Sequence, residues 1–394
     1  MKVLIGALGT TEYQEAIYAI APQNPTKYFV YAIAQNERPD KTFILTTNEA
    51  YNKHWHALTK EFCNLGESSS LEAICIPLGA TQEEAWEIFY KIADRIPSDS
   101  ELIVDITTSL RSIPTLLLSA VRYLQYARNV KIQTIYYGAF EAKETKTGTV
   151  LVTVPVYTMD SFITLLDWAA AIDTFRRTGN AIPLAERLEA QQNDLALQNT
   201  AILTRALRNL SSALDLTLSQ TIVVSAHELM TELASVTQIE TSSRPLTQPI
   251  IELLAGIKEE IRPFAIERPR DDVRKFLRAT FALIKWYYER ERYTNALQLA
   301  REWCITWCMF RNNLPNSDLW LYEKRRNYAK NLKSDTDVGS FWEPMRKLRN
   351  RISHTESEEK DFDIDDPPKL EATVTEVKQI IEEVLKLRDK VAAL

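Results

Sequence analysis

The spacing of apolar residues changes near residue 158, and this change constrains the fold more than any other feature of the chain. Before it, short runs rich in Val, Ile, Phe and Tyr alternate with segments whose apolar residues recur at helical spacing. After it, helical spacing continues with almost no strand signal. The pattern predicts an α/β N-terminal domain with a mostly parallel sheet, followed by an all-α helical C-terminal half.

Short apolar runs in residues 1–157 are candidates for strands. Between them, Glu49–Asn64 and Gln82–Arg95 have helical spacing, which favours βαβ units. The polar segment Glu141–Gly148 separates the last two runs and is typical of a hairpin loop, so we expect the sheet to end in an antiparallel edge. The predicted strands are Lys2–Leu8, Tyr28–Ile33, Phe43–Thr46, Ala73–Ile76, Leu102–Ile106, Lys131–Phe140 and Val150–Tyr157.

The helical half divides where prolines cluster before Asp272. Residues 262–272 have the composition of a linker, and five of the eight tryptophans follow it, enough aromatic bulk for a separate small core. We therefore predict three domains, residues 1–157, 158–270 and 271–394. The helices expected in the middle domain are Ser161–Arg177, Leu184–Leu216, Gln220–Val236 and Pro249–Ile261.

Composition excludes several classes of protein. The formal net charge of -6 leaves no global basic field, so any contact with nucleic acid would be local. The first apolar run is too short for a signal peptide, and no stretch reaches about 18 uninterrupted apolar residues, so we expect a cytoplasmic protein without a membrane span. The four cysteines form no CxxC pair and no set of metal ligands is found, so we expect neither disulfides nor a metal site.

A Gly-Thr-Thr turn follows the first predicted strand. Its glycines lack the spacing of the GxGxxG fingerprint, which argues against a dinucleotide site and against a small-metabolite enzyme. Backbone N–H groups and hydroxyls at the carboxyl end of a strand are nevertheless suited to an anion. Gly9, Thr10 and Thr11 are therefore candidate ligand-binding residues, and a plain tight turn is the alternative.

A second segment, Asp105–Pro114, follows the apolar strand residues Leu102–Val104. It carries three consecutive hydroxyls and an arginine immediately before a helix that is apolar almost all round. Hydroxyls and an arginine at the N-terminus of a buried helix are well placed to bind phosphate. A capped helix with a surface arginine is the alternative. The candidate residues are Thr107, Thr108, Ser109 and Arg111.

Near the C-terminus, Arg349, Asn350 and His354 lie between a predicted helix and an acidic loop. Read alone, they form a basic helix end that complements the helix dipole. Metal-independent RNA cleavage by the 2′-hydroxyl needs a group that titrates near neutrality and a positive charge on the phosphorane, which His354 and Arg349 would supply. Asn350 would orient the imidazole or donate a hydrogen bond to the phosphate. The other histidines, His54, His56 and His227, are interpreted as surface or packing residues.

The spacing adds a constraint on that site. Positions five apart lie about 140° apart around a helix, so Arg349 and His354 do not share one face of a straight helix. Either the helix ends or distorts near Ser353, or the site is assembled from two chains. One histidine per chain also supplies too little for a reaction that needs both an acid and a base, which favours the dimer.

Taken in order, these segments resemble the CRISPR-associated ancillary ribonucleases of type III systems, in which a CRISPR-associated Rossmann-fold (CARF) sensor precedes a HEPN nuclease domain. The resemblance covers essentially the whole chain, and the Asp-Ile-Thr…Arg-Ser-x-Pro segment at residues 105–114 is its most specific part. It implies an α/β Rossmann-like CARF domain at residues 1–157, a helical connecting region at 158–270 and a HEPN domain at 271–394.

The resemblance also implies a function. A homodimeric sensor, with further assembly left open, would bind a cyclic oligoadenylate, with cyclic tetra-adenylate as the expected ring. The ligand would activate metal-independent endoribonuclease cleavage of single-stranded RNA in antiviral defence, without a cofactor. The family often has a His-Gly pair where Thr108 and Ser109 stand, so ring size and ring cleavage remain open. The alternative is a sensor or ring nuclease whose C-terminal domain is silent or binds a partner.

Overall fold

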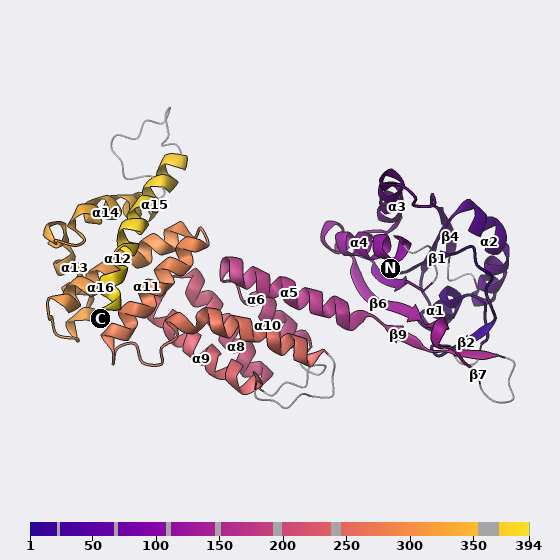
Figure 1. The fold of residues 1–394 in the computed structure, drawn as a ribbon, viewed down its shortest axis with the longest axis horizontal. Helices are drawn as coiled ribbons and strands as arrows, with labels where there is room; N and C mark the ends of the chain where they lie inside the picture. Colours follow the sequence, from indigo (N-terminus) through magenta and orange to yellow (C-terminus); the bar gives the residue numbers. More distant parts are fainter. Residues whose placement is uncertain are drawn as a thin grey trace. The chain divides into compact units, whose positions relative to one another are not determined.

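The computed structural model describes residues 1–21, 24–66, 70–107, 112–145, 151–191, 199–237, 246–353 and 370–393. The chain forms two compact units, residues 1–163 and 164–394. The first is an α/β unit built on a mostly parallel sheet and the second is helical, which confirms the predicted fold class (Figure 1). None of the helices among the described residues is both long and apolar enough to cross a membrane.

The main sheet of the first unit has the strand order β4-β3-β1-β5-β6-β9. Neighbours from β4 to β6 pair in parallel, and β9 pairs antiparallel with β6, so the predicted antiparallel edge is confirmed. A smaller sheet has the order β2-β8-β7. The strands are β1 (Lys2–Leu8), β2 (Ala16–Tyr18), β3 (Lys41–Thr46), β4 (Ser70–Cys75), β5 (Glu101–Asp105), β6 (Lys131–Gly138), β7 (Glu144–Thr145), β8 (Val152–Val154) and β9 (Val156–Thr158).

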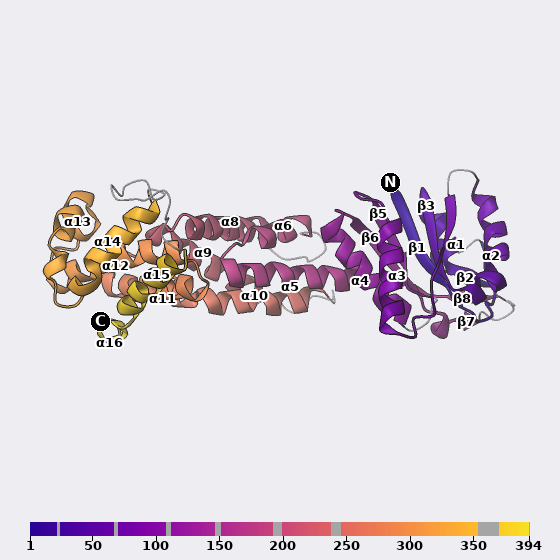
Figure 2. The same cartoon turned by 90° about the horizontal axis from the view of Figure 1, so that it is seen from above.

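Helices cover both faces of the main sheet (Figures 1 and 2). On one face, α1 (Phe29–Glu37) and α2 (Asn48–Phe62) pack over Leu4 and its neighbours. On the other, α3 (Gln82–Arg95) and α4 (Ser112–Ala127) pack over Ile5 and its neighbours. Because side chains alternate between the two faces of a strand, double coverage requires continuous apolar runs, as in β1.

Two expected strands differ from the structure. The run expected at Val150–Tyr157 forms β8 in the smaller sheet and β9 in the main sheet. Residues 28–33 were expected to form a strand, but the run lies largely in α1. The side chains of residues 29–34 are all buried in this helix, so it has no polar face until its last turn. A short, fully buried helix cannot be distinguished from a buried strand by periodicity. The helix expected at Leu184–Leu216 is described as two, α6 (Ile182–Ala190) and α8 (Thr200–Asp215), and residues 192–198 lie outside the described residues.

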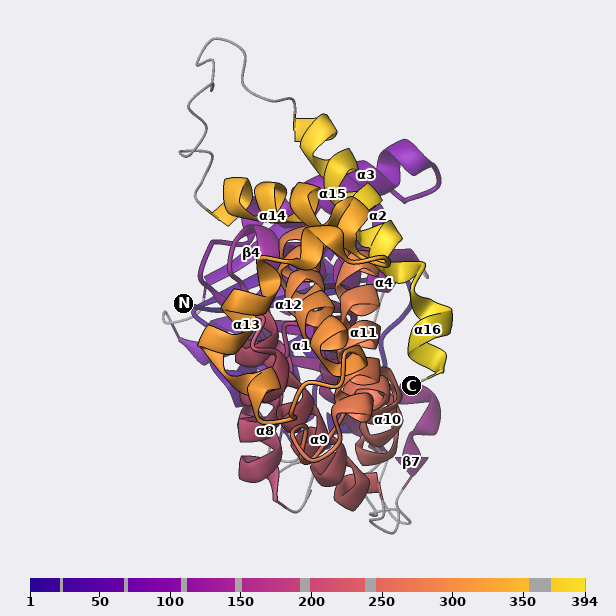
Figure 3. The ribbon, with the colours of Figure 1, turned by 90° about the vertical axis from the view of Figure 1, so that its left-hand side faces the viewer.

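The helices of the second unit share one cluster of buried side chains that extends from Trp168 to Val391. Figure 3 shows the C-terminal part of this unit, in which α12 contacts α11, α13, α14 and α15. The predicted boundary at residue 270 falls inside this unit. The further helices are α5 (Asp160–Thr178), α9 (Ser219–Thr237), α10 (Thr247–Ile261), α11 (Val273–Glu289), α12 (Tyr293–Arg311), α13 (Tyr322–Ala329), α14 (Gly339–Ser353), α15 (Leu370–Leu385) and α16 (Arg388–Ala392).

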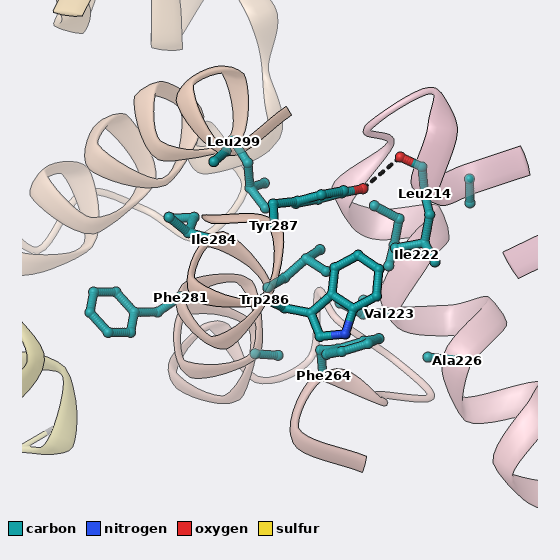
Figure 4. Packing of buried hydrophobic residues seen from close by; sticks show 14 of the residues in the cluster. Leu214, Ile222, Val223, Ala226, Phe264, Phe281, Ile284, Trp286, Tyr287 and Leu299 are labelled. Carbon is teal, nitrogen blue, oxygen red and sulfur yellow. Dashed lines mark hydrogen bonds between the residues drawn. The ribbon is translucent and has the colours of Figure 1, made fainter. Parts of the chain in front are cut away.

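Two aromatic residues of α11 pack against side chains that precede residue 270 (Figure 4). The ring of Trp286 meets the edge of Phe264 with 6.1 Å between ring centres. The side chain of Tyr287 is buried, and its hydroxyl donates a hydrogen bond of 2.6 Å to the carbonyl oxygen of Leu214. Since such contacts join the two helical regions in one core, we expect both regions to unfold together.

Candidate functional site

The carboxyl ends of β1 and β5 meet at one edge of the main sheet. Their register places Ile5 opposite Val104, so both strands run toward the same edge. From β1 the chain moves outward to β3 and β4 and then returns to β5 on the other side of β1, which makes the gap between β1 and β5 a topological switch point. Open α/β sheets bind ligands at such points. The structure therefore brings Gly9–Thr11 and Thr107, which follow these two strands, to the same edge.

The Gly9–Thr11 loop is held from two sides. Within its own segment, the backbone N–H of Gly9 donates to the Tyr13 hydroxyl oxygen at 2.7 Å. From α2, Lys53 Nζ lies 2.8 Å from the carbonyl oxygen of Thr10. His54 Nε2 lies 2.9 Å from the carbonyl oxygen of Thr11. The hydroxyls of the two threonines have no hydrogen-bond partner within the described part of the chain, so they remain available to a ligand.

The second candidate segment begins at a buried carboxylate. The Asp105 side chain is 2% exposed, and its Oδ1 accepts a hydrogen bond of 2.8 Å from the backbone N–H of Thr107. Its Oδ2 has no hydrogen-bond partner among the residues described. The hydroxyl oxygen of Thr107 in turn accepts a hydrogen bond of 2.8 Å from the backbone N–H of Gly138, at the end of β6. Asp105 and Thr107 thus connect the ends of β5 and β6.

Burial changes the chemistry of Asp105. The loss of hydration raises its carboxyl pKa to about 6, against the lowering effect of the hydrogen bonds from Thr107. Space beside the carboxylate is tight: a Cβ added to Gly6 of β1 would lie 3.2 Å from Asp105 Cβ and 3.1 Å from a methyl group of Val30. Gly6 is therefore required by the close approach of β5 and α1 rather than by a phosphate contact.

Thr108, Ser109 and Arg111 lie outside the described residues, so their contacts with a ligand stay predictions. Within the described part, the Thr107 hydroxyl oxygen is engaged with Gly138. Its predicted contact with the ligand also stays a prediction.

Replacing Thr107 with valine should speed amide hydrogen exchange at Gly138 about fivefold. The substitution keeps the side-chain shape but removes the acceptor, and one neutral hydrogen bond contributes about 1 kcal/mol. Exchange of the peptide covering the end of β6, measured by mass spectrometry, checks this. The matched control is Thr115→Val, because Thr115 is exposed on α4; equal rates in both variants would contradict the assignment.

The third candidate group lies on α14. Phe341, Met345 and Leu348 recur at helical spacing and form its buried face, while Arg349 and Asn350 are half-buried beside it. Arg349 Nη1 donates to Asn350 Oδ1 at 3.2 Å. The structure therefore places two of the three predicted nuclease residues side by side. The last described residue of α14 is Ser353, and His354 lies outside the described residues.

Arg349 faces a pocket of about 180 Å³ between α14, α12 and the start of α9, lined also by Glu302, Gln298, Leu299, Thr217 and Ser219. Glu302 is neutralised by two other arginines, Arg325 at 2.8 Å and Arg301. Arg349 itself has no acidic partner within 4.0 Å among the described residues. An arginine that pairs with no carboxylate of the described residues, beside an open pocket, is suited to bind phosphate oxygens.

The next basic residue on α14 has a different role. Arg351 Nη2 bonds Glu376 of α15 at 3.0 Å, and its Nε is buried. Arg351 therefore anchors the end of α14 to α15. Within the described residues, no group of three or more His, Cys, Asp or Glu side chains is arranged to hold a metal ion.

Sequence reasoning missed the residues that hold the first loop. Tyr13 was not singled out, Lys53 was not considered, and His54 was interpreted only as a surface or packing residue. His54 is indeed buried, at 5% exposure, but its ring also reaches the loop. No local signal identifies this contact, because Thr11 and His54 lie 43 residues apart. They meet because β1 and β3 pair in parallel.

Polar residues after two neighbouring strands, at the switch point of a doubly covered parallel sheet, are typical of ligand-binding α/β domains. Residues 3–141 match the family model described as the CARF domain of the CRISPR system endoribonuclease Csx1. Residues 164–263 match the model described as the second domain of the CRISPR-associated protein MJ1674. The chain is similar to the CRISPR-associated protein MJ1674 of Methanocaldococcus jannaschii, with 22% identity over 322 residues. This alignment covers 77% of the chain and 45% of the relative, so the chain spans about half the length of that curated relative.

Together these matches support a CRISPR-associated protein with an N-terminal CARF domain. The first match contains both candidate ligand loops, and the second begins at residue 164, where the second unit begins. Arg349 and Asn350 lie beyond both matched segments. The HEPN assignment of residues 271–394 therefore remains a prediction from the sequence.

Proposed function

We propose that the protein is a cyclic-oligoadenylate-activated, metal-independent endoribonuclease that cleaves single-stranded RNA in type III CRISPR defence. The observation that carries the proposal is the position of Gly9–Thr11 and Thr107 at the switch point of a sheet that matches a Csx1 CARF domain. A CARF domain suggests cyclic-oligoadenylate sensing, and the matching family is that of the CARF domain of a CRISPR system endoribonuclease.

The chemistry of the two loops suits such a ligand. A cyclic oligoadenylate presents phosphodiester oxygens, which accept hydrogen bonds. The side-chain hydroxyls of the two loops, together with Arg111, would donate these hydrogen bonds. Cyclic tetra-adenylate is the ring that we expect from the family resemblance, and its symmetry includes a two-fold axis, which cyclic hexa-adenylate shares. Two copies of the chain can therefore contact such a ring with the same residues. A homodimer with the ligand on its two-fold axis follows from this choice.

The nuclease residues proposed are Arg349, Asn350 and His354. His354 would transfer the proton of the 2′-hydroxyl as that oxygen attacks the neighbouring phosphate. Arg349 would stabilise the charge that develops on the phosphorane. Its place beside a pocket whose one described carboxylate, Glu302, is paired with Arg325 supports this role. Since Arg349 and His354 do not share one face of a straight helix, we place the site between two chains, where ligand binding shifts the dimer between two arrangements.

Purified protein should cleave single-stranded RNA at least tenfold faster with cyclic tetra-adenylate than without it, in the presence of a metal chelator. Activation requires the ligand to bind one dimer arrangement more tightly, and tenfold corresponds to about 1.4 kcal/mol of difference. A labelled RNA, with cyclic tetra- and hexa-adenylate compared, provides the measurement. The product should end in a 2′,3′-cyclic phosphate, because the 2′-oxygen is the nucleophile.

Three other results would each contradict this proposal in a distinct way. An RNA cleavage rate that does not depend on the ligand would show that the sensor domain does not regulate the nuclease. Tight ligand binding without RNA cleavage would indicate a sensor whose C-terminal domain is silent or binds a partner. Conversion of the ring to linear oligoadenylate, seen by chromatography, without RNA cleavage would indicate a ring nuclease.

A further inference from the structure

Two neighbouring side chains of α2, Lys53 and His54, contact the Gly9–Thr11 loop. We infer that His54, assisted by Lys53, is a positioning residue that holds this loop in its ligand-binding shape through the backbone of Thr10 and Thr11. The inference rests on the proposed function of the loop as part of the cyclic-oligoadenylate site. It assigns a role to a histidine that the binding and cleavage chemistry does not otherwise use.

The contacts are specific for backbone oxygens. His54 Nε2 lies 2.9 Å from the Thr11 carbonyl oxygen and Lys53 Nζ lies 2.8 Å from that of Thr10. A carbonyl oxygen can only accept, so Nε2 must carry a proton and donate. Lys53 also pairs with Glu12 at 2.8 Å, which ties the next residue of the loop to the same helix. Successive residues of one loop are thus bound to one turn of α2.

The imidazole is held in place before any ligand binds. Its ring packs against Tyr13 with 4.7 Å between ring centres and against Tyr28 at 6.1 Å. The Tyr13 hydroxyl oxygen accepts from the Gly9 N–H, so the ring also supports the third backbone contact of the loop. The two tyrosine rings also contact each other, with 5.4 Å between ring centres, so they form one aromatic cluster against the imidazole. A donor fixed by such packing loses little side-chain freedom when it bonds the loop.

This arrangement explains how an exposed, polar loop could be ordered for binding. The carbonyl oxygens of Thr10 and Thr11 are occupied by α2, while the threonine hydroxyls have no partner among the residues described. The two hydroxyls can therefore donate to a phosphodiester, while the carbonyl oxygens, which would repel it, already accept from α2. Ordering the loop in advance avoids part of the entropy that ligand binding would otherwise cost.

A second histidine on α2, His56, provides a control for substitutions of His54. His56 is two residues further along α2 and is exposed, whereas His54 is 5% exposed. A phenylalanine at position 54 keeps a planar ring against the two tyrosines but cannot donate. A glutamine at position 54 has an amide N–H that can reach the place of Nε2. The variants H54F, H54Q and H56F therefore separate the hydrogen bond from the packing.

The first experiment measures the affinity of each full-length variant for cyclic tetra-adenylate by calorimetry. We expect H54F to bind three- to tenfold more weakly than the wild type, as the loss of one hydrogen bond predicts. H54Q should recover most of that loss and H56F should show none. Wild-type affinity in H54F, or equal weakening in H54F and H54Q, would overturn the inference.

The second experiment needs no ligand. Amide hydrogen exchange of the peptide covering residues 9–13 should be faster in H54F than in the wild type or H56F, with thermal midpoints unchanged. Equal exchange in H54F and H56F would overturn the positioning role even if the ligand binds. Faster exchange in H54F combined with a wild type that binds no cyclic oligoadenylate would instead leave the loop anchored as inferred and refute the proposed function.

Discussion

Alanine in place of Arg349 or His354 should slow ligand-activated RNA cleavage at least ~100-fold. Removing one group that stabilises the transition-state charge costs on the order of 10²–10³ in rate, and removing a general acid or base costs on the order of 10²–10⁴. Affinity for cyclic tetra-adenylate should not change, because α14 belongs to the second unit and the ligand loops to the first. Single-turnover cleavage of a labelled RNA, with ligand saturating, measures the loss.

Arg346 is the matched control, since it lies exposed on the same helix and pairs with Glu343 at 3.0 Å. R346A should cleave within about twofold of the wild type. A loss in R346A as large as in R349A would show that helix charge, and not the Arg349 contact, sets the rate. Arg351 is unsuitable as a control because it bonds Glu376 of α15, so its loss would disturb the fold.

Mixing the two inactive variants tests whether the site is shared between chains. In a heterodimer of R349A with H354A, the remaining Arg349 and His354 belong to different chains. Activity should return after mixing only if these two residues act together across the dimer axis. A mixture as inactive as its components would contradict a site that pairs one Arg349 with one His354 across the axis.

The stability of the first unit should fall as the pH rises from about 4 to about 6, and Asp105→Asn should remove this fall. The ordinary pKa of aspartate is 3.8, whereas burial raises that of Asp105 to about 6. In this window the folded state keeps a proton that the unfolded state has released, so raising the pH favours unfolding. Two pKa units correspond to roughly 3 kcal/mol, so D105N should gain about that much relative to the wild type between pH 4 and pH 8.

Urea unfolding, followed by hydrogen exchange of the peptide that covers β5, reports the stability of this unit at each pH. The quantity to compare is the difference between wild type and D105N, because the other titrating groups cancel. A difference that stays constant from pH 4 to pH 8 would show that Asp105 does not titrate above its ordinary range. Asparagine can still accept from the Thr107 N–H, so the loop geometry should persist in the variant.

The strands and the gross architecture were predictable because double burial leaves a direct mark on the sequence. β1 was predicted at its observed bounds, Lys2–Leu8, and α3 at Gln82–Arg95, where an apolar stripe and a polar face coexist. α1 was not predictable in the same way. Its buried residues face apolar neighbours on every side, so periodicity carries no information about helix or strand.

The candidate site divides similarly. The residues at strand ends, such as Thr11 and Thr107, could be found because parallel strands present their carboxyl ends at one edge. The partners that hold them, His54 of α2 for Thr11 and Gly138 of β6 for Thr107, could not be found. Each contact joins residues more than 30 positions apart, and only the order of the strands brings them together.

The Arg349 region shows the same limit in the helical unit. Its basic residues look alike in the sequence, yet Arg351 bonds Glu376, Arg346 bonds Glu343, and Arg349 lines a pocket. By itself the sequence determined the order of an α/β domain and a helical half, and the chemistry available at the strand ends and on α14. Residue type and the spacing of buried apolar residues can be read within short stretches of the chain. Which side chains are bound and which remain free was decided only by the tertiary structure, because that depends on partners supplied by distant parts of the chain.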